Sequence, residues 1–193
     1  MTTGAADRAA ETAERRRRLV EAAVALARGG GYEAVHMRDV AARADVALAT
    51  LYRQYSSKDQ LLLAALADQA RALRDHLATR PVEGRDPHDR IARVLTLATR
   101  ALTREPTLTA AMVTALGSPE PDAAAMKLEI LDLLGGIVRD AGDLGDGTDD
   151  AAAMRTLGYV WLAVLSAWSS GMIDDETMTE DLATAAELLL AAS

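Results

Sequence analysis

The chain has 193 residues, half of them hydrophobic but none of them phenylalanine or cysteine, and a formal net charge of −8. The absence of cysteine excludes disulfides and thiolate metal sites. The longest apolar run, Leu157 to Trp168, is interrupted and shorter than the roughly 20 residues of a membrane span. No charged-then-apolar leader indicates export. We therefore expect a soluble cytoplasmic protein without a membrane partner.

Charge is unevenly distributed along the chain. Residues 1–60 carry ten Arg and Lys against eight Asp and Glu, a balance of +2, whereas residues 61–193 carry eleven against twenty-one, a balance of −10. Such an asymmetry indicates a nucleic-acid-facing first part and a solvated remainder. Strong helix formers dominate, and no window alternates apolar and polar residues over the length of a strand. The expected fold is all-α, with about nine helices.

The first 30 residues contain one predicted helix. Residues 1–10 are small and polar and are predicted to form a flexible tail. An amphipathic helix is predicted from Glu11 to Arg28, and its start carries the arginine run Arg15–Arg18. The glycine triplet Gly29–Gly31 follows. Because no strand precedes it, a phosphate-binding loop is disfavoured, and a helix C-terminal cap with a left-handed residue is predicted.

Two short helices and a long one come next. The short helices are predicted at His36–Arg43 and Ala47–Tyr55, and they are joined by a tight turn at Ala44–Val46. Asp45 suits this turn because aspartate tolerates a left-handed backbone. The long helix is predicted from Ser57 to about Thr79, beginning with a capping-box pattern of serine and, three residues later, glutamine. Its length of roughly 35 Å would make it the only helix long enough to connect two distant sites.

Five further helices follow a Pro/Gly linker at residues 81–87. Asp86 is predicted to cap the first of them, with Pro87 in its first turn. They are predicted at about 87–104, 107–117, 121–141, 149–171 and 177–192. The run Gly142–Asp150 is rich in aspartate but lacks the spacing of an EF-hand loop. We therefore expect a solvated helix connection there and no metal site.

Two short helices joined by a three-residue turn predict a helix-turn-helix. In that motif the second helix presents its N-terminal residues to base edges, while the first crosses the DNA backbone. Thr50 can reach a phosphate or meet a thymine methyl, and Lys58 lies where a helix N-terminus attracts anions. Taken singly, each residue has a plain alternative, a solvated face for the arginine run and core packing for Tyr55. The candidate DNA-binding residues are Arg17, Arg18, His36, Met37, Arg38, Ala47, Leu48, Ala49, Thr50, Tyr52, Arg53 and Lys58.

The stretch GGYEAVHMRDVAARADVALATLYRQYSSKDQLLLAAL resembles the N-terminal signature of the TetR family of bacterial transcriptional repressors. There, a Thr-aliphatic-Tyr-x-x-aromatic-x-Ser-Lys-acidic-x-Leu string spans helices 3 and 4. The resemblance covers roughly residues 15–66. Together with VWLAVLSAW, the first part of this stretch is further similar to the KstR-type regulators of cholesterol and steroid catabolism. Departures from the family pattern are Gln54, His36 and Asp45. The string itself consists here of Thr50, Leu51, Tyr52, Tyr55, Ser57, Lys58, Asp59 and Leu61.

The resemblance implies a helix-turn-helix DNA-binding domain at 11–56 and an effector-binding and dimerisation domain at 57–193. It also implies a homodimer on a palindromic double-stranded DNA operator, released by a small apolar effector such as a steroid-derived acyl-CoA, with no cofactor. For each residue of the second domain, ordinary core packing is the alternative. Candidates for effector binding are Leu108, Met112, Leu116, Leu128, Leu131, Trp161 and Leu165, and candidates for the dimer interface are Trp161, Trp168, Leu182, Ala186 and Leu189.

Rival functions have less support in the sequence. The histidines His36, His76 and His88 show no convergent nucleophile or metal-ligand spacing, so we expect no catalytic residue and no enzyme. A helical adaptor that binds proteins would not need the Thr50–Lys58 string. Within the family, a regulator of efflux or of other lipid metabolism with a different apolar effector is the alternative.

Overall fold

The computed structural model describes residues 3–144 and 148–190, and within these ranges it contains nine α-helices, two short 3-10 turns and no strand. The all-α prediction is confirmed. The predicted end of the last helix, at 192, lies outside the described residues. The elements are α1 (Thr3–Gly30), η1 (Tyr32–Ala34), α2 (Met37–Arg43), α3 (Leu48–Gln54), α4 (Lys58–Thr79), α5 (Pro87–Thr103), α6 (Pro106–Gly117), η2 (Pro121–Ala123), α7 (Ala124–Gly142), α8 (Thr148–Ser169) and α9 (Asp175–Leu190).

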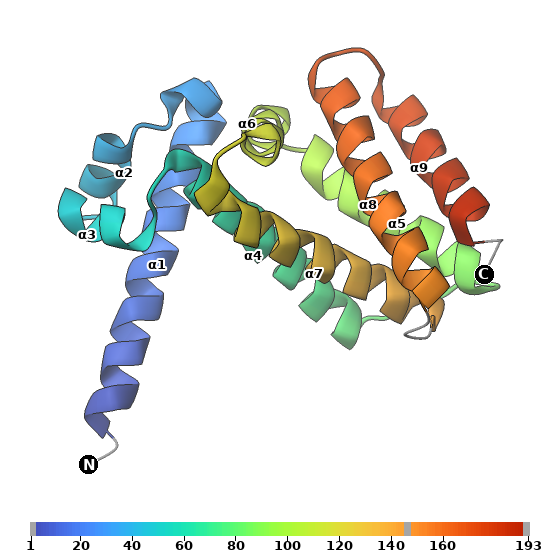
Figure 1. Ribbon diagram of the computed structural model, residues 1–193, viewed down its shortest axis with the longest axis horizontal. Coiled ribbons are helices and arrows are strands. Elements are labelled where there is room, and N and C mark those ends of the chain that lie inside the picture. Colours follow the sequence, from blue (N-terminus) through green and yellow to red (C-terminus); the bar gives the residue numbers. More distant parts are fainter. Residues whose placement is uncertain (1–2, 145–147, 191–193) are drawn as a thin grey trace.

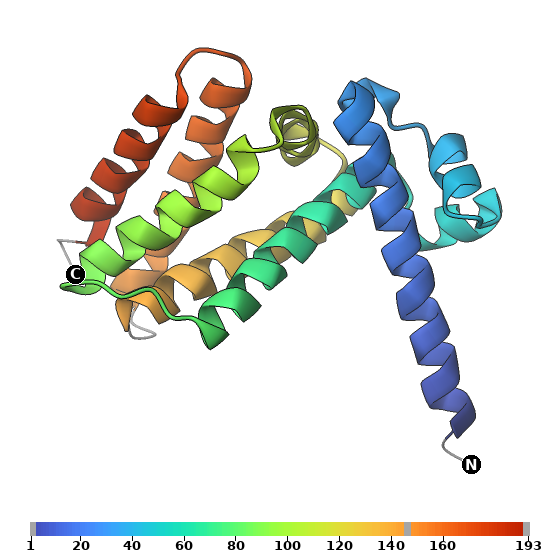
Figure 2. The same ribbon diagram turned by 180° about the vertical axis from the view of Figure 1, so that it is seen from behind.

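The helices form a small N-terminal unit and a larger bundle. The helices α1, α2 and α3 lie together at one end, and α4 leads from them into the bundle of α5 to α9 (Figure 1). Within the bundle α4 packs along α7, and α9 packs against both α5 and α8 (Figure 2). The short helix α6 lies where the two parts meet and contacts both α1 and α4.

Local sequence signals set several helix ends. The hydroxyl of Ser57 accepts a hydrogen bond from the backbone N–H of Gln60 at 3.4 Å, and this caps α4. The carboxylate of Asp86 does the same for α5 at 2.9 Å, with Pro87 in the first turn. Gly31 has φ 70 and follows the end of α1. The two caps were predicted from the sequence and are confirmed. A glycine with positive φ does follow α1, but its ψ of −162 lies outside the left-handed helical conformation that was predicted.

The start of α1 differs from the prediction. The helix begins at Thr3 rather than Glu11, so residues 3–10 continue it and do not form the predicted tail. The reason is intrinsic propensity, because the segment is rich in alanine and contains no breaker after Gly4. Surface pairs add support, since Arg17 forms ion pairs with Glu14 and Glu21, each at 2.6 Å. Residues 6–14 are exposed, and this end of α1 projects from the N-terminal unit (Figure 1).

One hydrophobic core runs through both parts of the molecule. It extends from Leu19 in α1, through Leu51 in α3 and Leu61 in α4, to Leu182 in α9. A second, smaller cluster around Ile91 joins α5, α7, α8 and α9. Because apolar packing is continuous across the predicted domain boundary, the N-terminal unit is packed against the bundle and does not hang from a linker.

Candidate functional site

The turn between α2 and α3 is held by its own backbone and by α1. Asp45 has φ 53, the left-handed conformation predicted for it. Nη1 of Arg18 in α1 donates a hydrogen bond to the carbonyl oxygen of Ala44 at 3.0 Å. Val40 of α2 and Leu51 of α3 are fully buried at the crossing of the two helices. The orientation of α3 relative to α2 is therefore fixed, as a helix-turn-helix requires.

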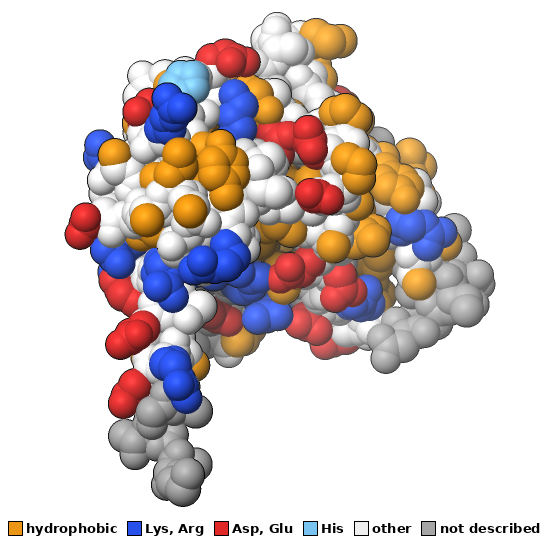
Figure 3. Space-filling model, turned by 60° about the vertical axis from the view of Figure 1, so that its left-hand side comes forward, with side chains coloured by type: hydrophobic (Ala, Val, Ile, Leu, Met, Phe, Trp, Pro, Cys, Tyr) orange, Lys and Arg blue, Asp and Glu red, His pale blue; other side chains and the backbone are white. Residues whose placement is uncertain are grey.

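The N-terminal half of α3 presents small and polar side chains to solvent. Tyr52 is 51% exposed, whereas Tyr55 is only 4% exposed and packs in the core, where the sequence placed it. Figure 3 shows this end of the molecule, with Lys and Arg side chains in a band beneath a surface of mostly uncharged side chains. Of the residues predicted to contact DNA from this helix, Ala47, Ala49, Tyr52 and Arg53 are exposed, and Leu48 and Thr50 are half-buried.

The other predicted DNA contacts lie in different environments. His36 is the N-cap residue of α2 without a side-chain cap bond, and both it and Arg38 are exposed. Met37 is half-buried against the core. Arg17 is exposed but engaged by two glutamates, and Arg18 is turned inward to the α2–α3 turn. The exposed residues Arg38, Tyr52 and Arg53 are therefore the side chains most free to reach DNA.

Lys58 is tied to the segment η1. Its Nζ donates to the carbonyl oxygen of Tyr32 at 3.1 Å, lies 3.7 Å from the centroid of the Tyr32 ring, and is 3.6 Å from a carboxylate oxygen of Glu33. The hydroxyl of Tyr32 in turn donates to the buried carboxylate of Asp59 at 2.6 Å. Burial, and then this hydrogen bond, raise the pKa of Tyr32. A phosphate contact of Lys58 stays a prediction, and it would be made alongside these partners.

The N-terminal unit is also tied to α6 and η2. Arg28 at the end of α1 makes a two-pronged pair with Glu105 at the start of α6, through Nε at 2.6 Å and Nη2 at 2.8 Å. The Ser56 hydroxyl donates to the carboxylate of Asp122 at 3.2 Å, and Nε2 of Gln60 donates to the carbonyl oxygen of Asp122 at 2.9 Å. The fourth helix was predicted to be the only helix long enough to connect two distant sites; it is not the only link between the two parts, because α6 and η2 form a second connection.

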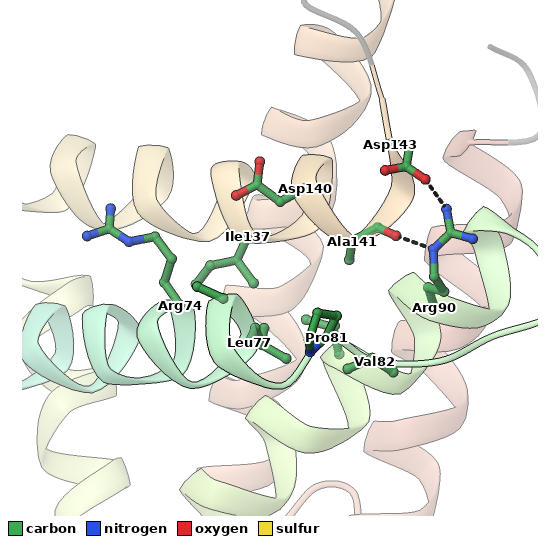
Figure 4. Close-up of a pocket in the computed structure, with 11 residues that line it drawn as sticks. Arg74, Leu77, Pro81, Val82, Arg90, Ile137, Asp140, Ala141 and Asp143 are labelled. Atoms are coloured by element: carbon green, nitrogen blue, oxygen red, sulfur yellow. Dashed lines mark hydrogen bonds and ion pairs between the residues drawn. The ribbon is translucent and has the colours of Figure 1, made fainter.

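A cavity of about 480 Å³ opens between the end of α4, the start of α5 and the end of α7; we call it the outer cavity. Figure 4 shows Leu77, Pro81 and Ile137 between Arg74 on one side and Arg90 on the other. Arg90 donates to the carbonyl oxygen of Ala141 and to Asp143, both at 2.7 Å. The side chain of Arg74 is 48% exposed, and its ion pair, with Asp75, is long at 3.9 Å.

Two smaller cavities, of about 50 and 40 Å³, lie further inside; we call them the inner cavities. Both are lined by Ala98 of α5, Leu134 of α7 and Trp161 of α8. On α4, the residues that line the first inner cavity, Leu66 to Leu73, directly precede those that line the outer cavity. The outer and inner cavities therefore follow one another along α4, α5 and α7.

The predicted effector-binding residues divide into three groups. Leu131 and Trp161 line the inner cavities. Leu108, Met112 and Leu165 are at most 1% exposed and pack in the core, and Leu116 is half-buried against it. Leu128 is 67% exposed, so its prediction was wrong: α7 turns Ile130, not Leu128, toward the core. The outer cavity was not predicted from the sequence, although Leu73 and Leu77 continue the apolar stripe of α4 to it.

Most of the predicted interface residues are covered by the chain itself. Trp161, Leu182 and Ala186 are 6%, 1% and 3% exposed, so their side chains pack inside the subunit and do not form the predicted interface. Trp168 and Leu189 are half-buried. An apolar stripe shows which face of a helix is covered but not which partner covers it, and here other helices of the bundle cover it. On the outer faces of α8 and α9, the large apolar side chains are Tyr159, 55% exposed, and Leu188, 72% exposed.

Within residues 3–144 and 148–190, no group of three or more His, Asp or Glu side chains is arranged to hold a metal ion. In the same part of the chain, no helix combines the length and the apolar character that crossing a membrane requires.

Two known protein families match the chain, one in the N-terminal unit and one in the bundle. Residues 19–65 match the family described as bacterial regulatory proteins, tetR family. Residues 84–189 match the tetracyclin repressor-like C-terminal domain. The HTH-type transcriptional repressor KstR of Rhodococcus jostii strain RHA1 is 39% identical over 178 residues, which are 92% of this chain and 83% of that protein.

Solved structures agree with this similarity. A TetR transcriptional regulator from Rhodococcus sp. RHA1 superposes with a TM-score of 0.86 at 30% identity, over 93% of this chain and 97% of that one. FadR of Thermus thermophilus, a TetR-family repressor in complex with lauroyl-CoA, shares the fold with a TM-score of 0.73 at 24% identity, over 91% and 93% of the two chains. The chain therefore belongs to the TetR family of bacterial transcriptional repressors, and within it to the KstR type, as a DNA-binding regulator rather than an enzyme.

Proposed function

We propose that the protein binds a palindromic operator as a homodimer and leaves it when an acyl thioester, such as a steroid-derived acyl-CoA, occupies the outer and inner cavities. Residues 1–60 of one chain carry a balance of only +2, so a single copy offers a weak electrostatic attraction to DNA. Two copies would place two α3 helices on half-sites about 34 Å apart, one turn of the duplex. The exposed Arg38, Tyr52 and Arg53 would supply the contacts.

The main support for the proposed effector is the row of cavities along α4, α5 and α7. Its outer end has Arg74 and Arg90 on the rim beside the carboxylates of Asp140 and Asp143, and its inner end is nearly all apolar. An acyl-CoA has matching chemistry, because its nucleotide head bears phosphates and its tail is apolar. Arginine is suited to phosphate through charge-assisted hydrogen bonds, and the ion pair of Arg74 with Asp75 is long, at 3.9 Å. The similarity to the KstR repressor, and to a FadR fold solved with lauroyl-CoA, supports the same class.

Effector binding would act by changing the packing of the bundle. The inner cavities are too small for an acyl tail as they stand, so their walls would have to separate. The leucine and methionine side chains that line them adapt readily to a new shape. Because α4, α6 and η2 contact the N-terminal unit, such a separation would alter the position of α3. Release requires that the effector bind the released conformer more tightly than the DNA-bound one.

A thermal-shift and release experiment tests this function. The probes are lauroyl-CoA and a steroid-derived acyl-CoA, and free CoA is the control for the head alone. We expect at least one thioester to raise the melting temperature and to release a fluorescent operator duplex, while free CoA does neither. If no thioester of either kind changes the melting temperature or the bound fraction of operator, the proposed effector class is wrong.

A further inference from the structure

Glu33, in the short turn η1, lies beside the ammonium group of Lys58. Its Oε2 is 3.6 Å from Nζ of Lys58, which is within ion-pair distance but longer than a hydrogen bond. The side chain of Glu33 is 90% exposed, and that of Lys58 is 24% exposed. In the described part of the chain, Glu33 has no other side-chain ion pair. Its carboxylate is therefore held only by attraction to Lys58 and is free to move away.

Tyr32 occupies two sides of the same ammonium group. Lys58 donates one hydrogen bond to the carbonyl oxygen of Tyr32 at 3.1 Å, and its Nζ lies 3.7 Å from the centroid of the Tyr32 ring. Tyr32 is itself held in place by the hydrogen bond from its hydroxyl to Asp59. An ammonium group has three N–H donors. One side of it is thus left for an anion, and in the free protein Glu33 takes that side.

The pair lies where the two flanks of the helix-turn-helix meet. Glu33 is in the turn that leads into α2, and α3 ends at Gln54, four residues before Lys58. The side chains of Arg38 in α2 and Tyr52 in α3 are exposed. Protein groups that flank a recognition helix contact the phosphates of the duplex and fix its position. An operator phosphate and the carboxylate of Glu33 would therefore meet the same side of one cation.

We propose that Glu33 competes with an operator phosphate for Lys58 and is displaced when the operator binds. The inference rests on the proposed function and names a residue that sets the strength of operator binding. A phosphate on Lys58 lies close to the carboxylate, and two like charges at this distance repel each other. Glu33 would weaken the binding of every duplex by the same factor, because a phosphate contact carries no sequence information.

The salt dependence of binding distinguishes displacement of Glu33 from a change of structure. A cation that neutralises one phosphate of B-DNA releases about 0.9 of a counterion. In the wild type, the displaced carboxylate takes up a cation from solution, so the net release at Lys58 is smaller. Glu33→Gln removes this exchange. We expect it to tighten operator binding about fivefold at about 0.1 M salt, and to make the slope of log K against log salt steeper by up to about 0.9 per subunit. The melting temperature should stay unchanged, because so exposed a pair adds little to stability.

Anisotropy titrations between about 0.05 and 0.3 M salt measure both effects. The probes are the duplex that the wild type selects from a random library and a scrambled duplex of the same composition. Glu11→Gln is the control, because Glu11 carries the same charge on the exposed part of α1 and has no ion pair in the described ranges. It should change the affinity less and keep the wild-type slope. Lys58→Gln should weaken binding, and the double variant Glu33→Gln/Lys58→Gln should bind no more tightly than Lys58→Gln alone.

The outcomes separate this inference from the proposed function. If Glu33→Gln has the affinity and the slope of Glu11→Gln, the inference is wrong while the proposed function stands. A gain in affinity that persists in the Lys58→Gln background also overturns the inference, because Glu33 would then repel DNA without competing for Lys58. If the wild type selects no duplex, the proposed function falls and the inference falls with it. Should Lys58→Gln fail to fold, the salt slopes of Glu33→Gln and Glu11→Gln still decide.

Discussion

At the scale of single residues, the pair of Tyr32 and Asp59 shows how a short motif joins two elements. Asp59 is 3% exposed at the start of α4, and its carboxylate accepts a hydrogen bond from the Tyr32 hydroxyl. A buried carboxylate without a donor is costly, so this bond stabilises the contact between η1 and α4. The adjacent Lys58 lies over the same ring. The motif therefore has a structural role in this chain in addition to the DNA contact predicted for it.

Removal of the Tyr32 hydroxyl should destabilise the fold. We expect Tyr32→Phe to lower the free energy of unfolding by about 1–3 kcal/mol, because Asp59 stays buried with one donor fewer. Burial and the hydrogen bond raise the pKa of Tyr32 in the folded state. Its contribution is therefore fully present below the ordinary tyrosine pKa of about 10 and is lost as pH rises through the raised value.

Urea denaturation of both proteins at pH 8 and at pH 11 measures this effect. The difference between wild type and Tyr32→Phe that is present at pH 8 should be smaller at pH 11, because above about pH 10 the unfolded phenol loses its proton while the folded phenol keeps it. Equal unfolding free energies at pH 8 would show that the hydrogen bond contributes nothing.

Arg74 provides a prediction about the rim of the outer cavity. We expect Arg74→Gln to weaken acyl-CoA binding by several-fold, because a charge-assisted contact to phosphate is lost, with little change in operator affinity. Arg93→Gln is the matched control. Arg93 is 58% exposed, is paired with Asp89 and does not line the cavity. Isothermal titration with lauroyl-CoA measures both variants, and equal losses in the two would remove Arg74 from the site.

At the scale of elements, most helix bounds apart from the start of α1 could be predicted, because their signals are local. Serine, aspartate, proline and glycine at the ends of α1, α4 and α5 act within one turn of the residues they cap. The face that a helix buries depends on long-range packing. This is why Leu128 was expected inside and is exposed, and why Leu182 was expected at an interface and is buried.

The features of the functional site also separate into local ones, which could be predicted from the sequence, and long-range ones, which could not. The helix-turn-helix could be predicted because its turn, its apolar crossing and its exposed residues lie within about twenty positions. The outer cavity combines the end of α4, the start of α5 and the end of α7, and no local pattern reports that these three ends meet. The pair of Arg28 and Glu105 is 77 residues apart in sequence, so it too could be found only in the fold.

The contact between α1 and α6 leads to a prediction about coupling. Arg28 and Glu105 are 54% and 39% exposed, so their pair should add less than about 1 kcal/mol to stability. The pair bridges α1 of the N-terminal unit and α6 of the bundle, so we expect it to affect the coupling between these two parts. We expect Arg28→Glu and Glu105→Arg each to change, by several-fold, the acyl-CoA concentration that releases the operator. The double variant, which restores opposite charges, should return it toward the wild-type value.

Fluorescence anisotropy measures operator release, and thermal melts measure the stability, of the wild type, the two single variants and the double variant. Similar melting temperatures would show that the fold is intact in each variant. If the release concentration is the same in the wild type and in both single variants, the pair does not couple the effector site to the N-terminal unit.

At the scale of the whole molecule, the proposed dimer would use the outer faces of α8 and α9. Tyr159 and Leu188 are large apolar side chains left exposed there. We expect Leu188→Arg to convert the dimer to a monomer and to abolish tight operator binding while the helical content stays unchanged. Leu128→Arg is the control, because Leu128 is similarly exposed but lies on α7.

Sedimentation velocity and circular dichroism measure both variants. A Leu188→Arg protein that remains dimeric would place the interface elsewhere. Loss of the dimer in Leu128→Arg instead would place it on α7. The distribution of charge is consistent with a small DNA-facing end, because the acidic excess lies in residues 61–193, away from the helix-turn-helix.

The most direct test of the central claim is selection of duplex DNA from a random library, followed by anisotropy titration of the selected sequence. We predict a palindrome with half-sites one turn apart, an affinity that falls steeply with salt, and loss of binding in Tyr52→Ala without loss of the fold. Enrichment of no sequence, or equal affinity of wild type and Tyr52→Ala for selected and scrambled duplexes, would contradict operator recognition by α3.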